Sequence, residues 1–335
     1  MKDNQPILSI CIPTYNRAKD LNHNLTLIES YLENSNLLDT VCLVISNNCS
    51  TDETGVVVKH FVDEGRLCIH YYKQEHNIGA GPNQVYAVEK VSTSWVMLLG
   101  DDDYLEPWYI EECLKQIEEH PNLGCIIPNY RDWNPVKKEL GGLREENCET
   151  KLYKAGFDAC LQNAWRAHQL SGLCFRRENV IEEFRKRGMN NLYPQIFFVS
   201  YCALRYDVLH FGHFCLRVSV VPQNQKDWNY RNDGLMNDIL QNFRYLNLSI
   251  KKRALLEAEF NKVSKRYYWV SGEERNIWIE NILKADNLSY LGGYYISKQI
   301  LREQCYTGKR YRWMFYLLAR IILFKNLITG RTIGL

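Results

Sequence analysis

The chain has 335 residues, 46% of them hydrophobic, and a formal net charge of +2, so it can bury a large core and lacks the basic excess typical of nucleic-acid-binding proteins. Its first residues lack the apolar run of a signal peptide, and no stretch reaches the roughly 18 apolar residues of a membrane span. The 12 cysteines are scattered without a C-x-x-C pair, so we expect reduced thiols in a cytoplasmic protein rather than disulfides or zinc.

Strand and helix patterns alternate through residues 1–128. Apolar runs predict strands at Ile7–Ile12, Val41–Ile45, Leu67–Tyr72, Val96–Leu99 and Gly124–Ile127. Between them, helices are expected at Ala18–Glu33, at Asp52–Glu64, at Pro82–Val91 and over a stretch ending near His120. This alternation predicts an α/β fold with a mostly parallel sheet that is covered by helices on both faces.

The pattern is less regular after residue 128. Asn129–Thr150 is rich in turn residues and is expected to be a loop. In residues 151–222 the pattern predicts helices at Ala155–Trp165 and Pro194–Arg205, with a further helix that ends at Gly188. It predicts strands at Gly172–Phe175 and Phe214–Val221. Leu235–Ser289 is largely helical in pattern. We therefore expect one α/β domain over residues 1–230, with halves at 1–128 and 151–230, followed by a helical region at 231–335.

The segment Tyr306–Leu335 carries basic side chains and no acidic one. Within it the apolar run W-M-F-Y-L-L-A-R-I-I-L-F is too short to span a bilayer and is interrupted by Arg320. A basic helix with aromatic residues suits the surface of an anionic membrane. A terminal helix packed on the protein's own core fits the same pattern equally well.

Three consecutive carboxylates, Asp101, Asp102 and Asp103, follow the apolar run Val96–Leu99 and Gly100. Adjacent carboxylates resist ionising together, and a divalent cation removes that repulsion. Mg²⁺ typically takes one or two carboxylates together with substrate phosphates. Asp103 could instead cap a helix that begins near Pro107, because acidic residues favour that end. One aspartate would suffice for a cap, so the triplet favours a metal–phosphate site.

Polar clusters also follow the first three predicted strands. Because the carboxyl ends of parallel strands share one edge of a sheet, we expect the clusters to meet the Asp triplet and to hold a base and a diphosphate. Each cluster alone is equally consistent with ordinary turns and helix caps. The clusters are P-T-Y-N-R at 13–17, S-N-N-C-S-T-D-E-T at 46–54 and H-N-I-G-A-G-P-N at 76–83.

These motifs, in this order and spacing, resemble glycosyltransferase family 2, which has the GT-A fold. The resemblance covers roughly the first 130 residues and implies sugar transfer from a nucleotide donor, mostly with inversion, using Mg²⁺ or Mn²⁺ at a D-x-D motif. It therefore assigns 1–128 to nucleotide-sugar binding and 151–230 to the acceptor. It implies a nucleotide site at Pro13, Thr14, Tyr15, Asn16, Arg17, Asn47, Asn48, Ser50, Asp52, Asn77, Gly79 and Asn83.

Two departures from the family pattern affect these assignments. Asn47 and Asn48 stand where the family often has aspartate, which leaves the donor nucleotide open. Aligned by Tyr104-Leu105, the first aspartate of D-x-D falls on Gly100. The metal ligands are then expected at Asp102 and Asp103, with Asp101 as a helper. This G-D-D-D variant is similar to O-antigen and capsule sugar transferases, including abequosyltransferase-like enzymes.

The family's catalytic base should lie some twenty residues after Ser171–Arg177, where this chain has Gln195 and no carboxylate. Because an amide does not take up a proton usefully, either another residue serves as the base or the sugar is transferred with retention. The alternatives are Asp207, Asp227 and the histidines 168, 210 and 213. For the acceptor side the sequence offers His168, Arg176 and Trp228.

The sequence thus predicts a metal-assisted glycosyltransferase in cell-surface polysaccharide synthesis, with a lipid-linked glycan as the expected acceptor. It would lie in the cytoplasm, peripheral to the inner face of the plasma membrane. A sugar-phosphate nucleotidyltransferase is a second interpretation, although the first cluster lacks the glycine-rich loop that such enzymes carry. A non-catalytic nucleotide- or glycan-binding module is the third, and the intact Asp triplet speaks against it.

Overall fold

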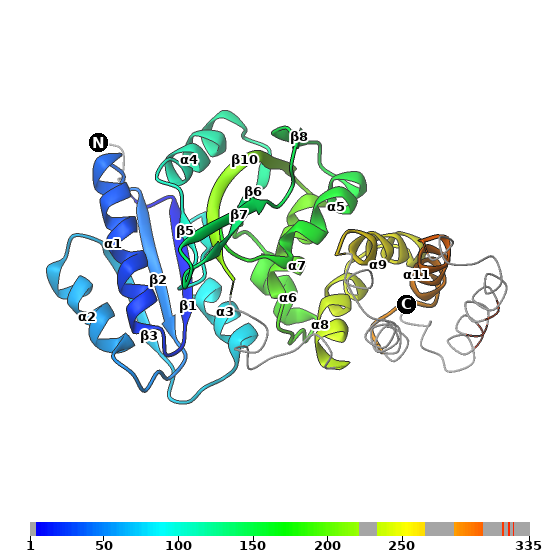
Figure 1. Cartoon of the computed structure of the whole chain (residues 1–335), viewed down its shortest axis with the longest axis horizontal. Helices are drawn as coiled ribbons and strands as arrows, with labels where there is room; N and C mark the ends of the chain where they lie inside the picture. Colours follow the sequence, from blue (N-terminus) through cyan, green and yellow to red (C-terminus); the bar gives the residue numbers. More distant parts are fainter. Residues whose placement is uncertain are drawn as a thin grey trace.

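A single mixed sheet forms the centre of the molecule (Figure 1). The computed structural model describes residues 5–220, 233–264 and 285–303, together with Leu317, Ile321 and Phe324. The strand order is β3-β2-β1-β4-β9-β6-β10-β5, with β7 paired to β6 and β8 paired to β10. The strands are β1 Leu8–Thr14, β2 Val41–Asn47, β3 Cys68–Lys73, β4 Trp95–Leu98, β5 Tyr104–Leu105, β6 Leu123–Asn134, β7 Glu139–Leu143, β8 Lys151–Tyr153, β9 Cys174–Arg176 and β10 Asp207–Ser219.

Helices cover both faces of this sheet. They are α1 Ala18–Asn34, α2 Thr54–Glu64, α3 Ala80–Glu89, α4 Tyr109–Glu119, α5 Phe157–Asn163, the 3-10 helix η1 Ala164–His168, α6 Val180–Lys186, α7 Pro194–Ala203, α8 Asp233–Arg244, α9 Ile250–Ser264 and α11 Tyr290–Glu303. One apolar cluster includes side chains of α1, α2 and α4, and a second includes those of α3 and α5–α9. The predicted covering of the sheet on both faces is therefore confirmed.

The apolar runs become strands because both faces of the sheet are buried. In β4, Trp95 and Met97 pack into the cluster under α1, whereas Val96 and Leu98 pack into the cluster under α3. Alternate side chains point to opposite faces of a strand, so a strand buried on both faces is apolar throughout. Each fully buried aliphatic side chain contributes about 1.5–3 kcal/mol.

Strand direction places the ends of six strands at one edge. The pairs β1–β2, β2–β3, β1–β4 and β6–β10 are parallel, and β9 is antiparallel to both β4 and β6. It follows that β1, β2, β3, β4, β6 and β10 all finish on the same edge, where β9 begins. We call this the active edge below, and the Asp triplet lies on it directly after β4.

Two expectations from the sequence were wrong in part, and one alternative reading of Asp103 is excluded. Cys42 and Cys68 form a disulfide, because the parallel register of β2 and β3 sets them opposite each other with Cα atoms 4.8 Å apart. The expected loop at 129–150 contains the end of β6 and all of β7, which pair as antiparallel strands. Asp103 caps no helix: β5 follows it, and α4 begins only at Tyr109.

Beyond β10, the described helices continue the same core. Phe243 of α8 and Phe260 of α9 belong to the apolar cluster that holds Phe197 and Phe198 of α7. A division between a domain at 1–230 and a helical region at 231–335 stays a prediction. Among the residues described, no helix is long and apolar enough to cross a bilayer. Of Tyr306–Leu335, the structure describes only the three isolated residues named above.

Candidate active site

Backbone contacts join the cluster after β1 to the cluster after β2. The Asn16 N–H donates to Ser50 Oγ at 2.9 Å, and the Thr51 N–H donates to Asn16 Oδ1 at 2.8 Å. The Arg17 N–H donates to Thr54 Oγ1 at 3.1 Å. Asn16 has φ of 52°, a left-handed conformation that asparagine adopts more readily than most residues. Tyr15, between these contacts and the end of β1, is 44% exposed.

Asp52 ties the starts of two helices together. Its Oδ2 accepts from the Ala18 N–H at 3.1 Å at the beginning of α1, and its Oδ1 accepts from the Thr54 N–H at 3.0 Å at the beginning of α2. Burial tends to raise the pKa of this carboxyl, but the hydrogen bonds from Thr54 and Ala18 outweigh burial and lower it. Both oxygens of Asp52 are thus engaged within the protein, which makes it a holder of the loops.

The amides of the predicted nucleotide site bond to other side chains and backbone groups of the same loops and strands. Asn48 Nδ2 donates to Asn77 Oδ1 at 2.8 Å, and Asn48 Oδ1 accepts from the Ile78 N–H at 2.8 Å. Asn83 Oδ1 accepts from Ser46 Oγ at 2.7 Å. Asn47, 0% exposed, donates to Tyr71 Oη at 2.8 Å. These buried amides fix the shape of the loops, whose backbone groups and exposed side chains then face solvent.

The turn after β4 is held from three sides. Asn24 of α1 donates to the Gly100 and Asp103 carbonyls at 3.1 and 2.9 Å. Asp103 Oδ2 accepts from Ser171 Oγ at 2.5 Å and from Gln169 Nε2 at 2.9 Å. Asp103 Oδ1 accepts from the Ser219 N–H at 2.7 Å at the end of β10. Asp103 therefore clamps three segments together, with both of its oxygens occupied.

The three carboxylates crowd negative charge into a buried turn. Burial and then the charge of Asp102 raise the pKa of Asp101 to about 8 and that of Asp103 to about 7, although hydrogen bonds to Asp103 oppose the rise. Asp102 is the least buried of the three. Carboxylate oxygens are the hard ligands that Mg²⁺ and Mn²⁺ prefer, and Asp102 is the most exposed candidate ligand of the triplet.

Glycine at position 100 matches this clamp. A Cβ there would stand 3.1 Å from Asp103 Oδ2 and 3.2 Å from Ser171 Oγ. Those two atoms already hydrogen bond to each other, and Ser171 Oγ also accepts from the Gly100 N–H at 2.9 Å. A side chain at position 100 would therefore have to displace the Asp103 and Ser171 side-chain oxygens by a few tenths of an ångström.

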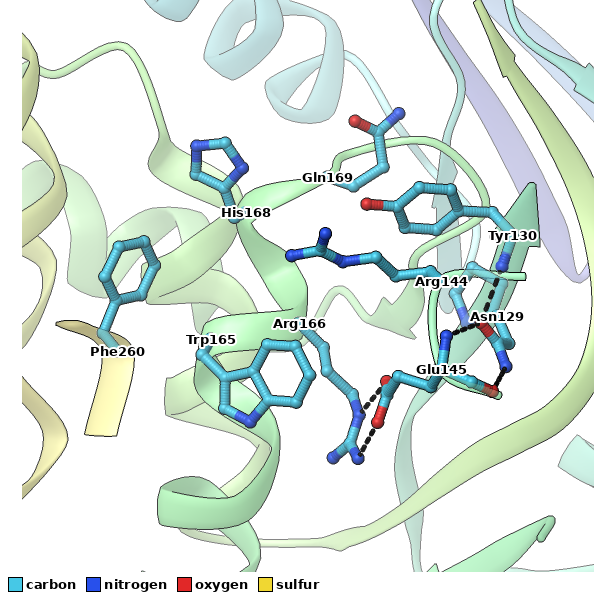
Figure 2. A pocket seen from close by; sticks show the side chains of 10 residues that line it. Asn129, Tyr130, Arg144, Glu145, Trp165, Arg166, His168, Gln169 and Phe260 are labelled. Carbon is cyan, nitrogen blue, oxygen red and sulfur yellow. Dashed lines mark hydrogen bonds and ion pairs between the residues drawn. The ribbon is translucent and has the colours of Figure 1, made fainter. Parts of the chain in front are cut away.

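A pocket opens beside the Asp103 clamp (Figure 2). Gln169 belongs to both, because it lines the pocket and donates to Asp103. His168, one of the residues weighed for the acceptor side and for the base, also lines the pocket, and its ring stacks on Tyr193 with centroids 4.9 Å apart. Further lining residues come from the end of β6, from the segment after β7, from η1 and from α9: Pro128, Asn129, Tyr130, Arg144, Glu145, Trp165, Arg166 and Phe260.

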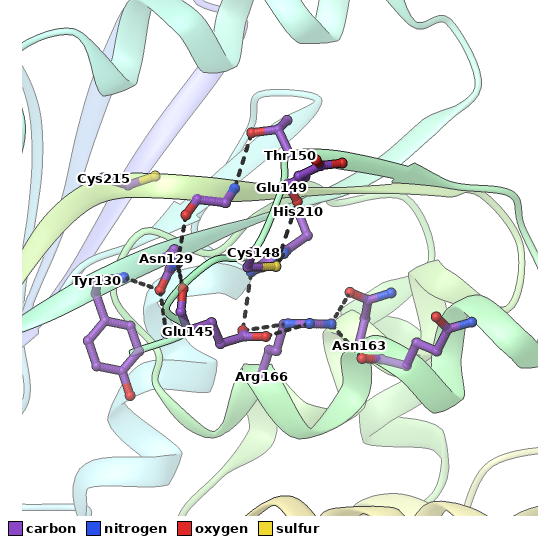
Figure 3. A network of polar contacts seen from close by, with 12 residues as sticks. Asn129, Tyr130, Glu145, Cys148, Glu149, Thr150, Asn163, Arg166, His210 and Cys215 are labelled. Carbon is purple, nitrogen blue, oxygen red and sulfur yellow. Dashed lines mark hydrogen bonds and ion pairs between the residues drawn. The ribbon is translucent and has the colours of Figure 1, made fainter. Parts of the chain in front are cut away.

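A polar network supports one wall of this pocket (Figure 3). Arg166 pairs with Glu145 through two contacts, Nε–Oε1 and Nη2–Oε2, both at 2.7 Å. The buried His210 sets Nε2 3.3 Å from Glu145 Oε1 and Nδ1 3.6 Å from Cys148 Sγ. Glu145, Cys148 and His210 offer ligand atoms within 4.8 Å of one another, but the Glu145 carboxylate is already paired with Arg166.

Several predicted residues lie away from the active edge or outside the described chain. Arg176 pairs with Trp95 at the start of β4 and bonds the Leu123 and Pro121 carbonyls, so it lies at the opposite edge. Asp207 begins β10 at that same opposite edge and pairs with Lys154 at 2.9 Å. Trp228 and Asp227 lie outside the described residues.

Gln195 lies in the core beneath the pocket. It is 2% exposed, its Oε1 accepts from Gln84 Nε2 at 3.1 Å, and its Nε2 donates to the His168 carbonyl at 3.3 Å. His213 is on an exposed stretch of β10, where its Nδ1 lies 3.3 Å from Thr150 Oγ1. A role in catalysis for Gln195 stays a prediction.

Sequence reasoning missed the residues that hold the triplet in place. Asn24 sits in the middle of α1, and Gln169 and Ser171 sit in a connection that has no motif of its own. The one available signal was a buried polar residue, Asn24, at the core-facing spacing of α1 between Leu21 and Ile28. Its partners are more than seventy residues away, so nothing local identified them.

Comparison with known proteins gives relatives that share the first part of the chain. The model of the family described as Glycosyl transferase family 2 matches residues 9–209. A chondroitin synthase of Pasteurella multocida is 32% identical over 183 residues, which are 53% of this chain and 18% of that protein. Abequosyltransferase RfbV of Salmonella typhimurium is 32% identical over 204 residues, 57% of this chain and 59% of that protein. Each match thus spans less than two thirds of the relative's length.

Solved structures show the same fold at low sequence identity. S. aureus TarS 1–349 in complex with UDP-GlcNAc aligns with a TM-score of 0.63 and 15% identity over 97% of this chain and 92% of that one. The mannosyltransferase PcManGT from Pyrobaculum calidifontis, in complex with GDP-Man and Mn²⁺, aligns with a TM-score of 0.55 and 14% identity over 97% and 86%. The predicted GT-A fold is therefore confirmed.

Proposed function

The chain belongs to glycosyl transferase family 2, and from this premise we propose that it transfers a sugar from a nucleotide-diphosphate donor to a glycan acceptor in polysaccharide synthesis. The observation that carries the proposal is the meeting of the Asp101–Asp103 turn with the loop after β1 on one edge of the sheet. The positive charge of Arg17, in that loop, acts to lower the pKa of Asp101, although burial and the charge of Asp102 outweigh it and raise that pKa.

We assign the donor's parts to the exposed members of the predicted nucleotide site. Tyr15 presents its ring to solvent at the end of β1 and would stack on the base. Arg17 would face the diphosphate beside the carboxylates. The amides Asn47, Asn48, Asn77 and Asn83 would act indirectly, by keeping the loops in shape through the hydrogen bonds they make to each other and to nearby backbone groups.

Asp102 would bind Mg²⁺ or Mn²⁺. Asp103 would fix the position of the turn through its hydrogen bonds to Gln169 and to the end of β10. When bound, the cation supplies charge that offsets the growing negative charge of the leaving diphosphate, which lowers the barrier for transfer. Tyr15 and Arg17 would orient the donor, and the pocket beside Gln169 would receive the acceptor. His168 is the member of the predicted base set that lines this pocket.

A nucleotide panel tests the donor assignment. We expect one of UDP, GDP, CDP or dTDP to raise the melting temperature with Mn²⁺ present and much less without it, because only the folded state binds the pair. Release of free nucleotide diphosphate from the matching sugar donor would then separate a transferase from a non-catalytic binding module. A chain that binds a nucleotide but never turns over its sugar donor would contradict the proposal.

We further propose that 306–335 contacts an anionic membrane, which would bring the enzyme to a lipid-linked acceptor. Leu317, Ile321 and Phe324 are each helical and 51%, 52% and 65% exposed, so three large apolar side chains of this segment face solvent. Replacing all three with glutamine should abolish flotation with anionic liposomes and leave melting unchanged. If flotation survives, or if the triple variant unfolds, the segment belongs to the protein's core or to another partner.

A further inference from the structure

The pocket beside Asp103 carries an excess of positive charge among the residues described. Both carboxylate oxygens of Glu145 accept hydrogen bonds from the Arg166 guanidinium, each at 2.7 Å. Arg166 is engaged further by the Gln162 carbonyl at 2.5 Å and by Asn163 Oδ1 at 2.9 Å. The charges of Glu145 and Arg166 therefore cancel within the wall of the pocket, and neither is left for a ligand.

Arg144 differs from its neighbour Arg166. Its guanidinium is exposed, and within residues 5–220, 233–264 and 285–303 no hydrogen bond or ion pair engages it. Figure 2 shows the side chain extending into the pocket, in the space between Gln169, His168 and Trp165. A cation in this position faces whatever enters the pocket, directly beside the clamp that holds the Asp triplet.

The backbone around Arg144 is fixed in place. The Arg144 N–H donates to the Tyr130 carbonyl at 2.8 Å. The next residue, Glu145, exchanges two contacts with the Asn129 side chain, whose Oδ1 accepts from the Glu145 N–H at 3.2 Å and whose Nδ2 donates to the Glu145 carbonyl at 2.9 Å. A side chain that starts from an anchored backbone loses less entropy on binding, which favours a built binding position.

An aromatic wall lies next to this cation. The Trp165 ring lines the pocket, and the Arg166 guanidinium lies over it with Cζ 4.6 Å from the ring centroid. Sugars present apolar C–H faces that pack on aromatic rings, while a guanidinium matches the two oxygens of a carboxylate or phosphate. The combination of Trp165 and Arg144 in one hollow is therefore suited to a sugar that bears an anionic group.

We infer that this pocket is an acceptor subsite for an anionic sugar unit, in which Arg144 binds a carboxylate or phosphate group and Trp165 packs against the ring. This inference rests on the proposed function for its placement on the acceptor side. The chemistry that it names is shared by two sources, a uronic acid and a sugar phosphate, which differ in charge and in the position of the anionic group.

Binding of three small probes to the full chain tests the subsite. The probes are methyl β-D-glucuronide, glucose 6-phosphate and the neutral methyl β-D-glucoside, measured by ligand-observed NMR titration at fixed ionic strength. A charge-assisted bidentate pair predicts that at least one anionic probe binds about tenfold more tightly than the neutral one. Preference for the glucuronide indicates a uronic acid, and preference for the phosphate indicates a phosphorylated unit.

Two variants show whether Arg144 is responsible. Arg144→Gln should bring the anionic probes down to the affinity of the neutral glucoside, whereas Arg144→Lys should keep part of the difference. Lys59→Gln, on exposed α2, removes the same charge far from the pocket and should leave all three affinities unchanged. Equal binding of the three probes to the unmodified chain, or an unchanged preference in Arg144→Gln, would overturn the inference.

The nucleotide panel keeps this outcome separate from that of the proposed function. A chain that binds nucleotide with Mn²⁺ but treats the three probes alike loses the anionic subsite and keeps the transferase. A chain that prefers an anionic probe but binds no nucleotide keeps a sugar-binding pocket and loses the transferase. The two proposals therefore fail on different measurements.

Discussion

The two halves of the active edge handle their polar groups in opposite ways. At the donor half, Asn47, Asn48 and Asn83 bury their amides and bond within the protein. At the acceptor half, Arg144 extends into an open pocket with its guanidinium unengaged among the described residues. The comparison teaches that buried motif residues such as Asn47 hold loops in shape, whereas an exposed cation such as Arg144 can lie outside any motif.

The largest effect is expected at the carboxylate we assign to the cation. Asp102→Asn should lower the transfer rate about 1,000-fold, because the transition state loses the charge that a cation at this position supplies. The melting temperature should barely change, since Asp102 is the least buried member of the triplet. Asp103→Asn is the matched variant and should lower both rate and stability. Near-normal turnover by Asp102→Asn would show that the cation is not held by Asp102.

The pocket wall that holds Glu145 should lose stability in acid. Burial tends to raise the pKa of Glu145, but contacts with His210 and Arg166 outweigh it and bring the pKa to about 2, from the 4.5 of an unperturbed glutamate. A carboxyl with a lowered folded pKa stabilises the protein above its unfolded pKa, so its contribution is lost as pH falls from about 4.5 towards 2.

Glu145→Gln tests that wall directly. We expect a loss of about 2–3 kcal/mol at pH 7, because Arg166 stays largely buried without its partner. The difference between the variant and the unmodified chain should shrink below pH 4. Urea unfolding at pH 7 and at pH 3 measures both quantities. A constant difference across that range would show that the pair does not set the acid stability.

A charge at position 195 should weaken the core beneath the pocket. In the unmodified chain the His168 carbonyl accepts from the Gln195 amide. Gln195→Glu places a carboxylate against that carbonyl, so we expect the free energy of unfolding to fall by about 2 kcal/mol. Gln195→Met keeps the volume without a charge and serves as the comparison. For both variants, NMR coupling constants should also be used to determine the anomeric configuration of the product. A faster inverting reaction in Gln195→Glu would show that position 195 is the base site.

The smallest effect is expected where the donor loops are tied together. Asp52→Ala removes an acceptor shared by the starts of α1 and α2, and should cost about 1 kcal/mol of stability while weakening nucleotide binding a few-fold. Asp63→Ala near the end of α2 removes an equal charge and should change neither. Thermal melting and nucleotide titration measure the two effects. Unchanged nucleotide affinity in Asp52→Ala would show that the Asp52 contacts are not needed for nucleotide binding.

The sequence by itself determined the strands and helices of the first 128 residues, apart from the short β5, and the edge at which the polar clusters meet. Apolar runs such as Val96–Leu99 and the turn residues behind them are local, and parallel strands must end together, so position along the chain predicted position in space. The Asp triplet was identifiable for the same reason, because adjacent like charges behind a buried strand are locally unfavourable without a partner.

Only the tertiary structure decided which residues reach the active edge from the second half. Arg176 was placed at the acceptor side by the resemblance of its segment to the family's strand before the acceptor region, but β9 runs antiparallel to β4 and carries it to the opposite edge. Cys42 and Cys68 meet through strand register, and Asp103 meets Gln169, Ser171 and Ser219 across 66 to 116 residues. Direction, register and long-range closure depend on the packing of the whole sheet, which no local pattern of side chains encodes.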